Sequence, residues 1–322
     1  MMTMILRAVA LGAALLVSGA AFAETYPSKP VKIIVPFPAG GVTDIAGRLI
    51  AQKLSEKLGH QFYIENVAGA GGNLGMAQVA RSPGDGYTIL LSSSSVTVNP
   101  SLYQKLPFDV EKDLIPVTKA GGSPNSWLVN PNFPAKTMKE LIDLFKREPG
   151  KYSVGSPGAG TTPSLSIEQL KFDLKLDFVT VPFAGGGPMT QSLLGGHVPI
   201  NCGAVGNAVA LIKEGKIRAL AITDKKRLAT LPDVPTLDEM GIKDQEAETI
   251  TGVFVPAGTP KEIVDLLQRE IAAIVKSPDI SARLLELGVV PEGSSPAEFT
   301  AYVKADIAKW RRVIETAKIP RI

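Results

Sequence analysis

The sequence has a single cysteine and only two histidines among its 322 residues. One cysteine excludes a disulfide bond within the chain, and so few soft ligands argue against a structural zinc site. Positive and negative charges nearly balance, with 34 Lys and Arg against 31 Asp and Glu, and no basic stripe typical of nucleic-acid binding is present. We therefore expect no metal, no cofactor and no nucleic-acid partner, and we interpret Cys202 as a small buried apolar residue.

Catalytic motifs are also missing. The chain has no Gly-x-Ser-x-Gly elbow, no Walker loop and no His-Glu-x-x-His motif. The glycine-rich stretch Gly69–Gly75 does not match the dinucleotide-binding fingerprint, because Leu74 stands where the third glycine belongs. His60 and His197 have no nucleophile or metal ligand nearby in the sequence, so we assign them structural roles. The sequence thus predicts a protein that is not an enzyme.

The one apolar run that needs to be weighed as a membrane span or a signal peptide lies at the N-terminus. Arg7 precedes the run from Ala8 to Val17, and small residues at Ala21 and Ala23 offer a cleavage site. The run is shorter than the ~20 residues of a membrane span, and this layout is typical of a secretory signal peptide. A membrane-tethering helix is the alternative interpretation. We predict a signal peptide at residues 1–23 and therefore export of the protein.

The rest of the chain has the composition of a folded protein, with 45% hydrophobic and 20% charged residues, and a length that predicts about two domains. A β-branched run at Val31–Val35 predicts a buried strand, and apolar residues at helical spacing follow from Ile45 to Leu58. Gly59 ends that helical pattern, and further strands are expected at Phe62–Ile64 and Thr88–Leu91. This βαβαβ order predicts an α/β class with a parallel sheet flanked by helices.

The same alternation returns with a helix that opens at a capping box predicted for Thr137–Glu140. The C-terminal third is mostly helical, and Thr259 and Ser295 are each predicted to be an N-cap with Pro at N1 and Glu at N3, the pattern of a capping box. Two extended apolar segments, 114–131 and 249–256, lie between these regions and are interpreted as strands that cross between domains. Two crossings imply that the first domain is discontinuous. We predict a first domain formed by residues 24–122 and 250–322 and a second domain formed by residues 123–249.

Four glycine-rich joints connect predicted strands to predicted helices: Phe37–Asp44, Gly69–Gly75, Gly155–Pro163 and Phe183–Pro188. The N-terminus of a helix carries free N–H groups and a partial positive charge, and glycine lets a ligand approach the backbone closely. We expect Thr162 and Gly187 to be N-caps, each followed by proline. None of the joints contains Lys or Arg, so an anion here would be held by amides, hydroxyls and helix dipoles. The alternative is that these loops only turn the chain.

Several stretches match a known family in order and spacing: Val35–Gly41 with Asp44 following, Glu65–Gly72, Pro83–Thr88, Asn99–Tyr103, Gly155–Pro163, Lys216–Thr223 and Leu231–Thr236. In these stretches the chain resembles the substrate-binding proteins of tripartite tricarboxylate transporters, the Bug family. The resemblance extends from about Tyr26 to the C-terminus. It implies a type II-like periplasmic binding protein fold, in which two α/β domains joined by two crossing strands close on a small organic carboxylate.

The resemblance also implies which loops hold the ligand. In the family, the loops that match Phe37–Asp44 and Gly155–Ser164 grip one carboxylate, the loop that matches Phe183–Gly187 completes that end, and the stretch that matches Gly203–Asn207 faces the variable end. From these loops and the serine run at residues 92–95 we predict the following ligand contacts: Phe37, Ala39, Gly40, Thr43, Asp44, Ser94, Gly160, Thr161, Thr162, Ser164, Phe183, Ala184, Gly185, Gly186, Ala204 and Asn207.

This chain departs from the family pattern in two places. Ser164 stands where the family often has His, and the region of Asn201 lacks an Asp that the family often has, which disfavours an amino-acid ligand. Phe37 and Phe183 each have two interpretations, as a core residue or as an apolar wall of the pocket.

Together these observations predict a monomeric periplasmic protein that captures a di- or tricarboxylate or an aromatic carboxylate for a tripartite tricarboxylate-type transporter. A sensor whose bound form docks on a membrane kinase is one alternative. An exported hydrolase or lyase is another, and it would depend on Asp44, the one acid inside a glycine joint, which we interpret instead as a residue that braces its loop.

Overall fold

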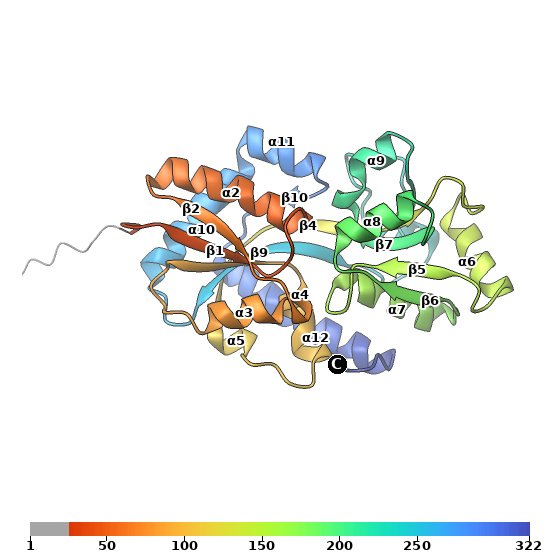
Figure 1. Cartoon of the computed structure of the whole chain (residues 1–322), viewed down its shortest axis with the longest axis horizontal. Helices are drawn as coiled ribbons and strands as arrows, with labels where there is room; N and C mark the ends of the chain where they lie inside the picture. Colours follow the sequence, from red (N-terminus) through yellow and green to blue (C-terminus); the bar gives the residue numbers. More distant parts are fainter. Residues whose placement is uncertain (1–25) are drawn as a thin grey trace, which may run out of the picture.

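The computed structural model describes residues 26–322, so the signal peptide predicted at residues 1–23 lies outside the described residues. The molecule is elongated, with two halves side by side along its long axis (Figure 1). Ten strands form one curled sheet that runs through both halves. The strands are β1 (Val31–Val35), β2 (Phe62–Asn66), β3 (Thr88–Ser92), β4 (Leu114–Val129), β5 (Ser153–Ser156), β6 (Val179–Pro182), β7 (Ile200–Ala204), β8 (Arg218–Ile222), β9 (Glu248–Pro256) and β10 (Val290–Pro291).

Helices flank the sheet in both halves, as the α/β prediction requires. The first half contains α2 to α5 and α10 to α12, and the second half contains α6 to α9. The helices are α2 (Val42–Leu58), η1 (Ala70–Gly72), α3 (Asn73–Ala80), α4 (Ser95–Leu102), α5 (Val110–Asp113), α6 (Met138–Arg147), α7 (Thr162–Leu174), α8 (Gly186–Leu194), η2 (Val205–Asn207), α9 (Val209–Lys213), η3 (Asp238–Met240), α10 (Lys261–Lys276), α11 (Pro278–Glu286) and α12 (Pro296–Thr316).

The strand order is β2-β1-β3-β9-β4-β7-β5-β6, with β8 and β10 also paired to β4. β1 pairs in parallel with β2 and β3, which confirms the predicted βαβαβ unit, and β5 pairs in parallel with β6 and β7. The sheet as a whole is mixed, because β4 and β9 run antiparallel to their neighbours. In both halves the carboxyl ends of the parallel strands face the boundary between the halves (Figure 1).

β4 connects the two halves. Over its first part, from Leu114 to Pro124, it pairs with β9, and from Asn125 to Val129 it pairs with β7 and β8 of the second half. The predicted crossing segments are thus real strands that lie side by side. The exact division into domains at residues 123 and 250 stays a prediction.

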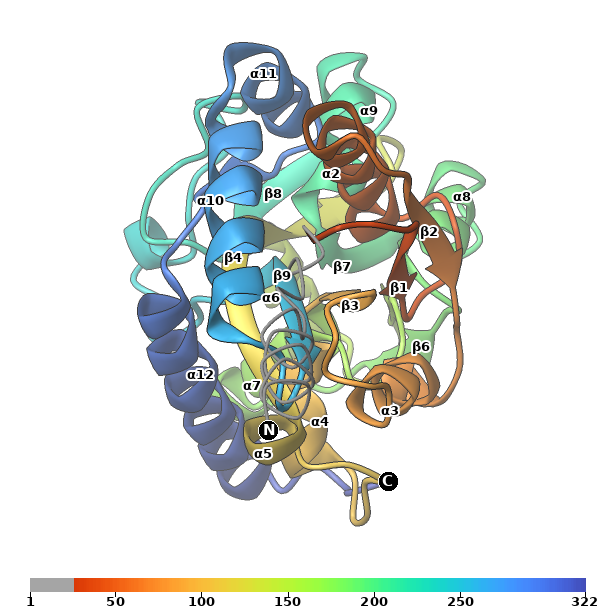
Figure 2. The same ribbon diagram turned by 90° about the vertical axis from the view of Figure 1, so that its left-hand side faces the viewer.

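Separate hydrophobic cores stabilise the halves. In the first half the sheet lies between α2, α10 and α11 on one face and α3, α4 and α12 on the other (Figure 2). In the second half α6 and α7 cover one face around Trp127, Phe145 and Phe178. Cys202 is part of this second core, fully buried as predicted, and burial raises the pKa of its thiol.

Helix ends follow the sequence signals in most places. Gly59 ends α2 in the left-handed conformation with φ 73°, and Ser295 and Glu298 form the predicted capping box of α12. The predicted N-cap at Thr259 is wrong, since α10 begins at Lys261 and Pro260 occupies the N-cap position. The Thr259 hydroxyl donates to the Pro256 carbonyl instead. Within residues 26–322 no helix has the length and apolar character needed to cross a membrane.

The two cores give a test of the domain prediction. Phe145 is fully buried against Phe178, with ring centroids 4.4 Å apart, so Phe145→Ala should cost about 3–5 kcal/mol. Trp127 lies in this core and reports the second half, whereas Trp310 on α12 packs with Val98 and Leu102 of the first half and with Leu165 of α7, so it reports mainly the first half. In single-tryptophan variants, we expect Phe145→Ala to lower the denaturation midpoint seen by Trp127 more than the midpoint seen by Trp310.

The matched control is Phe254→Ala, which removes an equally buried ring from the first half and should have the opposite effect on the two fluorescence signals. Equal shifts of both midpoints in both variants would mean that the halves unfold as one unit, and would contradict the predicted two domains.

Candidate ligand-binding site

Five loops meet at the boundary between the halves. Each follows a strand or precedes a helix at the carboxyl edge of the sheet, which is where ligands bind in open α/β sheets. We call this set the loop ring, and it consists of Phe37–Val42, Gly69–Gly72, Gly158–Thr162, Phe183–Gly186 and Val205–Asn207.

Neighbouring loops within each half are in direct contact. A Cβ atom built on Gly72 would lie 3.3 Å from Phe37 Cζ, so the first two loops of the ring touch. In the second half the Gly185 amide donates to the Pro157 carbonyl over 3.2 Å, and a Cβ atom on Gly158 would lie 2.8 Å from the Phe183 carbonyl oxygen. These close approaches require glycine and hold the loops of each half in a fixed arrangement.

Two further contacts join the halves and complete the ring. A Cβ atom on Gly71 would lie 3.4 Å from the Ala159 carbonyl oxygen, and one on Gly206 would lie 3.1 Å from Val42 Cγ2. Since the Asn207 side chain packs on Gly186, the last loop also touches its neighbour in the second half. The four predicted glycine joints therefore converge, as the sequence indicated.

The helices that begin in the ring present unpaired backbone amides. No side chain caps α2, α7 or α8, whereas α12, away from the ring, is capped by Ser295. α7 and α8 begin at Thr162 and Gly186, so the predicted N-caps Thr162 and Gly187 are wrong and the caps are Thr161 and Gly185. Within residues 26–322, the N–H groups at these helix starts that donate no hydrogen bond include those of Gly41, Val42, Thr43, Thr161, Thr162 and Gly186.

Asp44 braces the loop that precedes α2. Its carboxylate accepts hydrogen bonds from the Gly40 amide at 2.9 Å, from Asn66 at 2.9 Å and from Arg48 at 3.0 and 3.1 Å. Burial by itself would raise the pKa of Asp44, but the hydrogen bonds from Arg48, Gly40 and Asn66 outweigh burial and hold the pKa below its ordinary value. Each carboxylate oxygen is already paired, which favours the bracing role over contact with a ligand.

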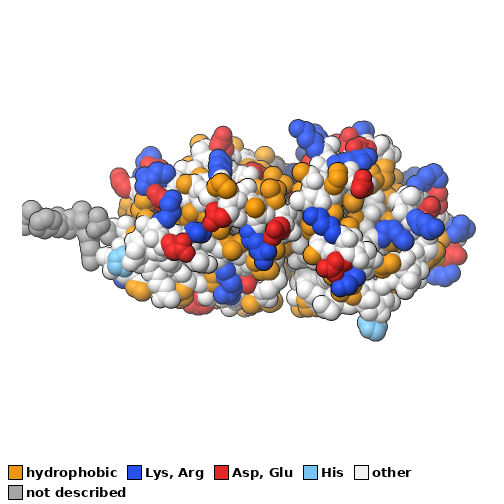
Figure 3. All heavy atoms as spheres, turned by 90° about the horizontal axis from the view of Figure 1, so that it is seen from above, with side chains coloured by type: hydrophobic (Ala, Val, Ile, Leu, Met, Phe, Trp, Pro, Cys, Tyr) orange, Lys and Arg blue, Asp and Glu red, His pale blue; other side chains and the backbone are white. Residues whose placement is uncertain are grey.

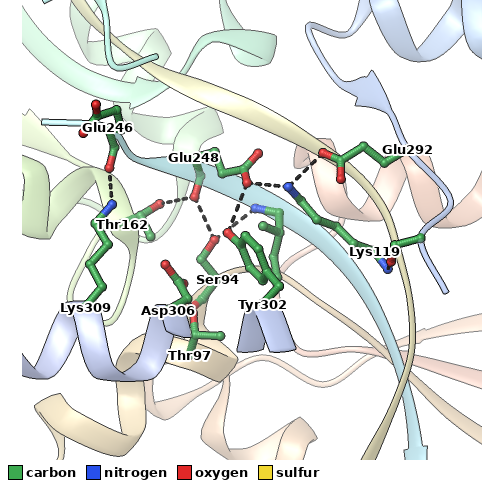
Figure 4. A network of polar contacts seen from close by, with 12 residues as sticks. Ser94, Thr97, Lys119, Thr162, Glu246, Glu248, Glu292, Tyr302, Asp306 and Lys309 are labelled. Carbon is green, nitrogen blue, oxygen red and sulfur yellow. Dashed lines mark hydrogen bonds and ion pairs between the residues drawn. The ribbon is translucent and has the colours of Figure 1, made fainter. Parts of the chain in front are cut away.

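Two hydroxyls predicted to contact the ligand donate to the same carbonyl in this structure, and their contact with a ligand stays a prediction. Ser94, the residue before α4, and Thr162, at the start of α7, each donate to the main-chain oxygen of Glu248 over 2.9 Å (Figure 4). Ser94 also accepts from the Ile250 amide at 3.0 Å, and both side chains are fully buried. These hydroxyls tie β9 to both halves of the molecule.

The side chain of Glu248, unlike its main-chain oxygen, binds residues of the first half and so anchors β9 to β4 and α12. Its carboxylate binds the ammonium of Lys119 on β4 and the hydroxyl of Tyr302 on α12, and Lys119 also pairs with Glu292 at 2.8 Å (Figure 4). Burial alone would lower the pKa of Lys119, but the two carboxylates outweigh it and raise the pKa, so the buried amine stays charged. The point where β9 passes between the halves is thus fixed by polar contacts as well as by the sheet.

The remaining predicted residues line the ring or adjoin it. Thr161 donates its hydroxyl to the Gly158 carbonyl at 2.7 Å, and Ala204 ends β7 next to the ring. Phe37 and Phe183 are half-buried ring residues, and their part in a ligand site stays a prediction, like that of the whole set. The predicted residues with exposed or partly exposed positions here are Phe37, Ala39, Gly40, Thr161, Ser164, Phe183, Ala184, Gly185, Gly186 and Asn207.

Sequence reasoning missed several residues that shape the site. Arg48 lies four residues after Asp44, a spacing that predicts a helical ion pair and could have been used. Ser95 and Asn99 on α4 contact Gly160 across the boundary, and only their place after a serine-rich strand end hinted at this. The Glu248 carbonyl gave no signal, because every residue carries one.

The ring contains no Lys or Arg, and the nearest cation on its helices, Arg48, is paired with Asp44. A furrow separates the halves on the face shown in Figure 3, where charged side chains of both signs are scattered on either side. In the part of the chain that the structure describes, no group of three or more His, Cys, Asp or Glu side chains could hold a metal ion. The ring can therefore attract an anion through amides and helix dipoles.

Comparison with known proteins identifies related chains. A sequence model of the family described as "Tripartite tricarboxylate transporter family receptor" matches residues 46–319. The curated "Protein BugT" of Bordetella pertussis is 34% identical over 294 residues, which cover 91% of this chain and 90% of BugT.

Solved structures agree with this result over nearly the whole chain. The structure titled "R. palustris Rpa4515 with adipate" is 34% identical, covers 92% of this chain and 100% of its own, and has a TM-score of 0.88. The structure of "periplasmic binding protein BugD" is 34% identical, covers 92% of this chain and 100% of its own, and has a TM-score of 0.86. The structure "MatC (Rpa3494) from Rhodopseudomonas palustris with bound malate" is 33% identical, covers 90% of this chain and 100% of its own, and has a TM-score of 0.83. The family and these neighbours are solute-binding proteins and not enzymes.

Asp44 supports a first prediction about the ring. Asp44→Asn removes the charge that accepts four hydrogen bonds and should lower the free energy of unfolding at pH 7 by about 2–3 kcal/mol. Because the folded pKa is depressed, this stabilisation is complete above the unfolded pKa of Asp and is lost as the pH falls through the folded value. Urea denaturation should show a difference from wild type that is constant between about pH 5 and 7 and shrinks below about pH 4.

The control is Asp143→Asn, which breaks a solvent-exposed pair with Lys139 on α6 and should leave the free energy of unfolding nearly unchanged. An equal loss in both variants, or a difference for Asp44→Asn that persists at the lowest pH, would contradict the bracing role.

Proposed function

Since this chain belongs to the tripartite tricarboxylate transporter receptor family, we propose that it binds a small organic carboxylate inside the loop ring. The observation that carries the proposal is the convergence of three uncapped helix N-termini, from α2, α7 and α8, in a ring without cationic side chains. Unpaired amides at helix starts bind anions, and a carboxylate has two oxygens that can accept several such donors at once.

The available donors are sufficient for useful affinity. A micromolar dissociation constant corresponds to about 8 kcal/mol, and each hydrogen bond to a charged group contributes about 1.5–3 kcal/mol. Four or five amide and hydroxyl donors can therefore outweigh the desolvation of one carboxylate. The solved relatives bind adipate and malate, which supports a dicarboxylate or a similar small acid as the ligand of this chain.

The two ends of the ring suit different parts of such a ligand. The loops Phe37–Val42 and Gly158–Thr162 supply the amides for one carboxylate. Phe37 and Phe183 supply apolar surface beside it, and the Asn207 amide lies toward the other end against Gly186. An aliphatic or aromatic acid fits the loop ring better than a sugar, because the loop ring combines anion-binding amides with apolar phenylalanine side chains.

We further infer that the protein acts in the periplasm as a monomer and delivers its ligand to the membrane subunits of a tripartite tricarboxylate-type transporter. The sequence at residues 1–23 supports export, and the family description supports the transporter partner. Closure of the two halves around β4 and β9 would trap the ligand before delivery.

A thermal-shift screen with a panel of carboxylates tests the proposal. A matching ligand at 100 times its dissociation constant should stabilise the protein by about 2.7 kcal/mol, whereas the neutral methyl ester of the same acid should have no effect. A panel in which no carboxylate raises the melting temperature, while neutral sugars or cations do, would contradict the ligand class.

Gly206 offers a test of closure. A side chain at this position would overlap the main-chain oxygen of Leu287 in the other half, while its backbone conformation is open to alanine. Gly206→Ala should therefore weaken ligand binding by about tenfold or more, roughly 1.4 kcal/mol, because the halves can no longer approach.

The same variant should still fold, since the overlap is relieved once the halves separate. Small-angle X-ray scattering should show that ligand reduces the radius of gyration of wild type but not of Gly206→Ala. Unchanged affinity in this variant would mean that the contact between Gly206 and Leu287 is not needed for binding.

A further inference from the structure

Ser95 joins the two halves directly behind the loop ring. It is the first residue of α4 in the first half, and its hydroxyl donates to the main-chain oxygen of Gly160 in the second half over 2.6 Å. The Ser95 side chain is fully buried, so water does not compete for this bond. Asn99, one turn later on α4, packs so closely on Gly160 that a Cβ atom there would lie 2.4 Å from Asn99 Oδ1 and would displace the amide.

This bond fixes the orientation of one peptide group. The carbonyl of Gly160 and the N–H of Thr161 belong to the same planar trans peptide, so the two groups point in opposite directions. Because Ser95 holds the carbonyl toward α4, the Thr161 amide points away from α4, toward the ring. Gly160 has φ 77°, a left-handed conformation that glycine adopts without strain, which allows the chain to present the amide in this way.

A second carbonyl of the same loop is also held back. The Thr161 hydroxyl binds the Gly158 carbonyl at 2.7 Å, and Gly158 is another left-handed residue, with φ 106°. Because these two carbonyls are paired to hydroxyls, neither of their oxygens is free to repel an anion at the N–H groups of the loop, and the Ala159 carbonyl oxygen lies toward Gly71. Successive amides arranged in this way form a concave anion site.

We propose that Ser95 is a positioning residue that aims the Thr161 amide into the ring when the two halves come together. This inference rests on the proposed function of the ring as a carboxylate site. The bond bridges the halves, so separation of the halves releases the Gly160 peptide and the amide loses its fixed direction. The ligand therefore binds more tightly when the two halves are in contact than when they are apart. This difference in affinity drives closure of the halves.

Ser95→Ala tests the proposal, with Ser92→Ala as the matched control. Ser92 lies three residues earlier, is equally buried, and its hydroxyl has no partner within the described residues, so its removal breaks no hydrogen bond. We expect Ser95→Ala to weaken the binding of the carboxylate found in the thermal-shift screen by about tenfold through faster dissociation. We expect Ser92→Ala to bind like wild type.

An amide signal separates positioning from general stability. In ¹H–¹⁵N spectra of the liganded protein, the Thr161 signal should differ between Ser95→Ala and wild type, while spectra of Ser92→Ala should match wild type at this residue. Should Ser95→Ala fail to fold, Ser95→Cys places a much weaker donor at the same position and should give the same loss.

The possible failures can be told apart. If wild type binds no carboxylate, the proposed function is wrong, and the role of Ser95 falls with it. If wild type binds but Ser95→Ala binds equally well with an unchanged Thr161 signal, Ser95 does not position the amide and only this inference is overturned. An equal loss of affinity in Ser92→Ala would also overturn it, because the effect would then come from the turn as a whole.

Discussion

Two antiparallel strands are the constraint on which the rest of this structure depends. β4 and β9 pair from Leu114 and Pro256 to Pro124 and Glu248, and β4 then continues alone into the sheet of the second half. The ladder between them leaves the halves few ways to move except rotation near Glu248. Buried contacts from Lys119, Tyr302, Ser94 and Thr162 hold that point, so the five loops of the ring meet in one defined arrangement.

Given this constraint, the chemistry of the ring follows from backbone geometry. Helices that start at the boundary need partners for their first amides, and here no side chain supplies them. Potential competitors are occupied elsewhere, since Asp44 is paired with Arg48 and the hydroxyls of Ser94 and Thr162 bind Glu248. What remains free in the ring is a set of amides, and such a set favours a small anion over a cation or a neutral sugar.

Much of this architecture could be predicted from the sequence, because its signals are local. The β-branched run Val31–Val35, the stop at Gly59 and the capping box at Ser295 each depend on a few neighbouring residues, and all three are confirmed. The convergence of the glycine joints was also predictable, since parallel strands place their carboxyl ends together. Long-range polar pairing was not, because Ser94 and Thr162 find a main-chain oxygen of Glu248 that no side-chain pattern marks.

Cys202 has a practical consequence. It is the single thiol of the chain, it lies inside the second core without exposure, and burial holds its pKa high, so thiolate is scarce and alkylating reagents reach it only when that half unfolds. A cysteine introduced at the rim of the furrow would consequently react alone. A fluorophore attached there would change its emission as the halves move, which would turn this chain into a reagentless optical biosensor without any native residue having to be removed first.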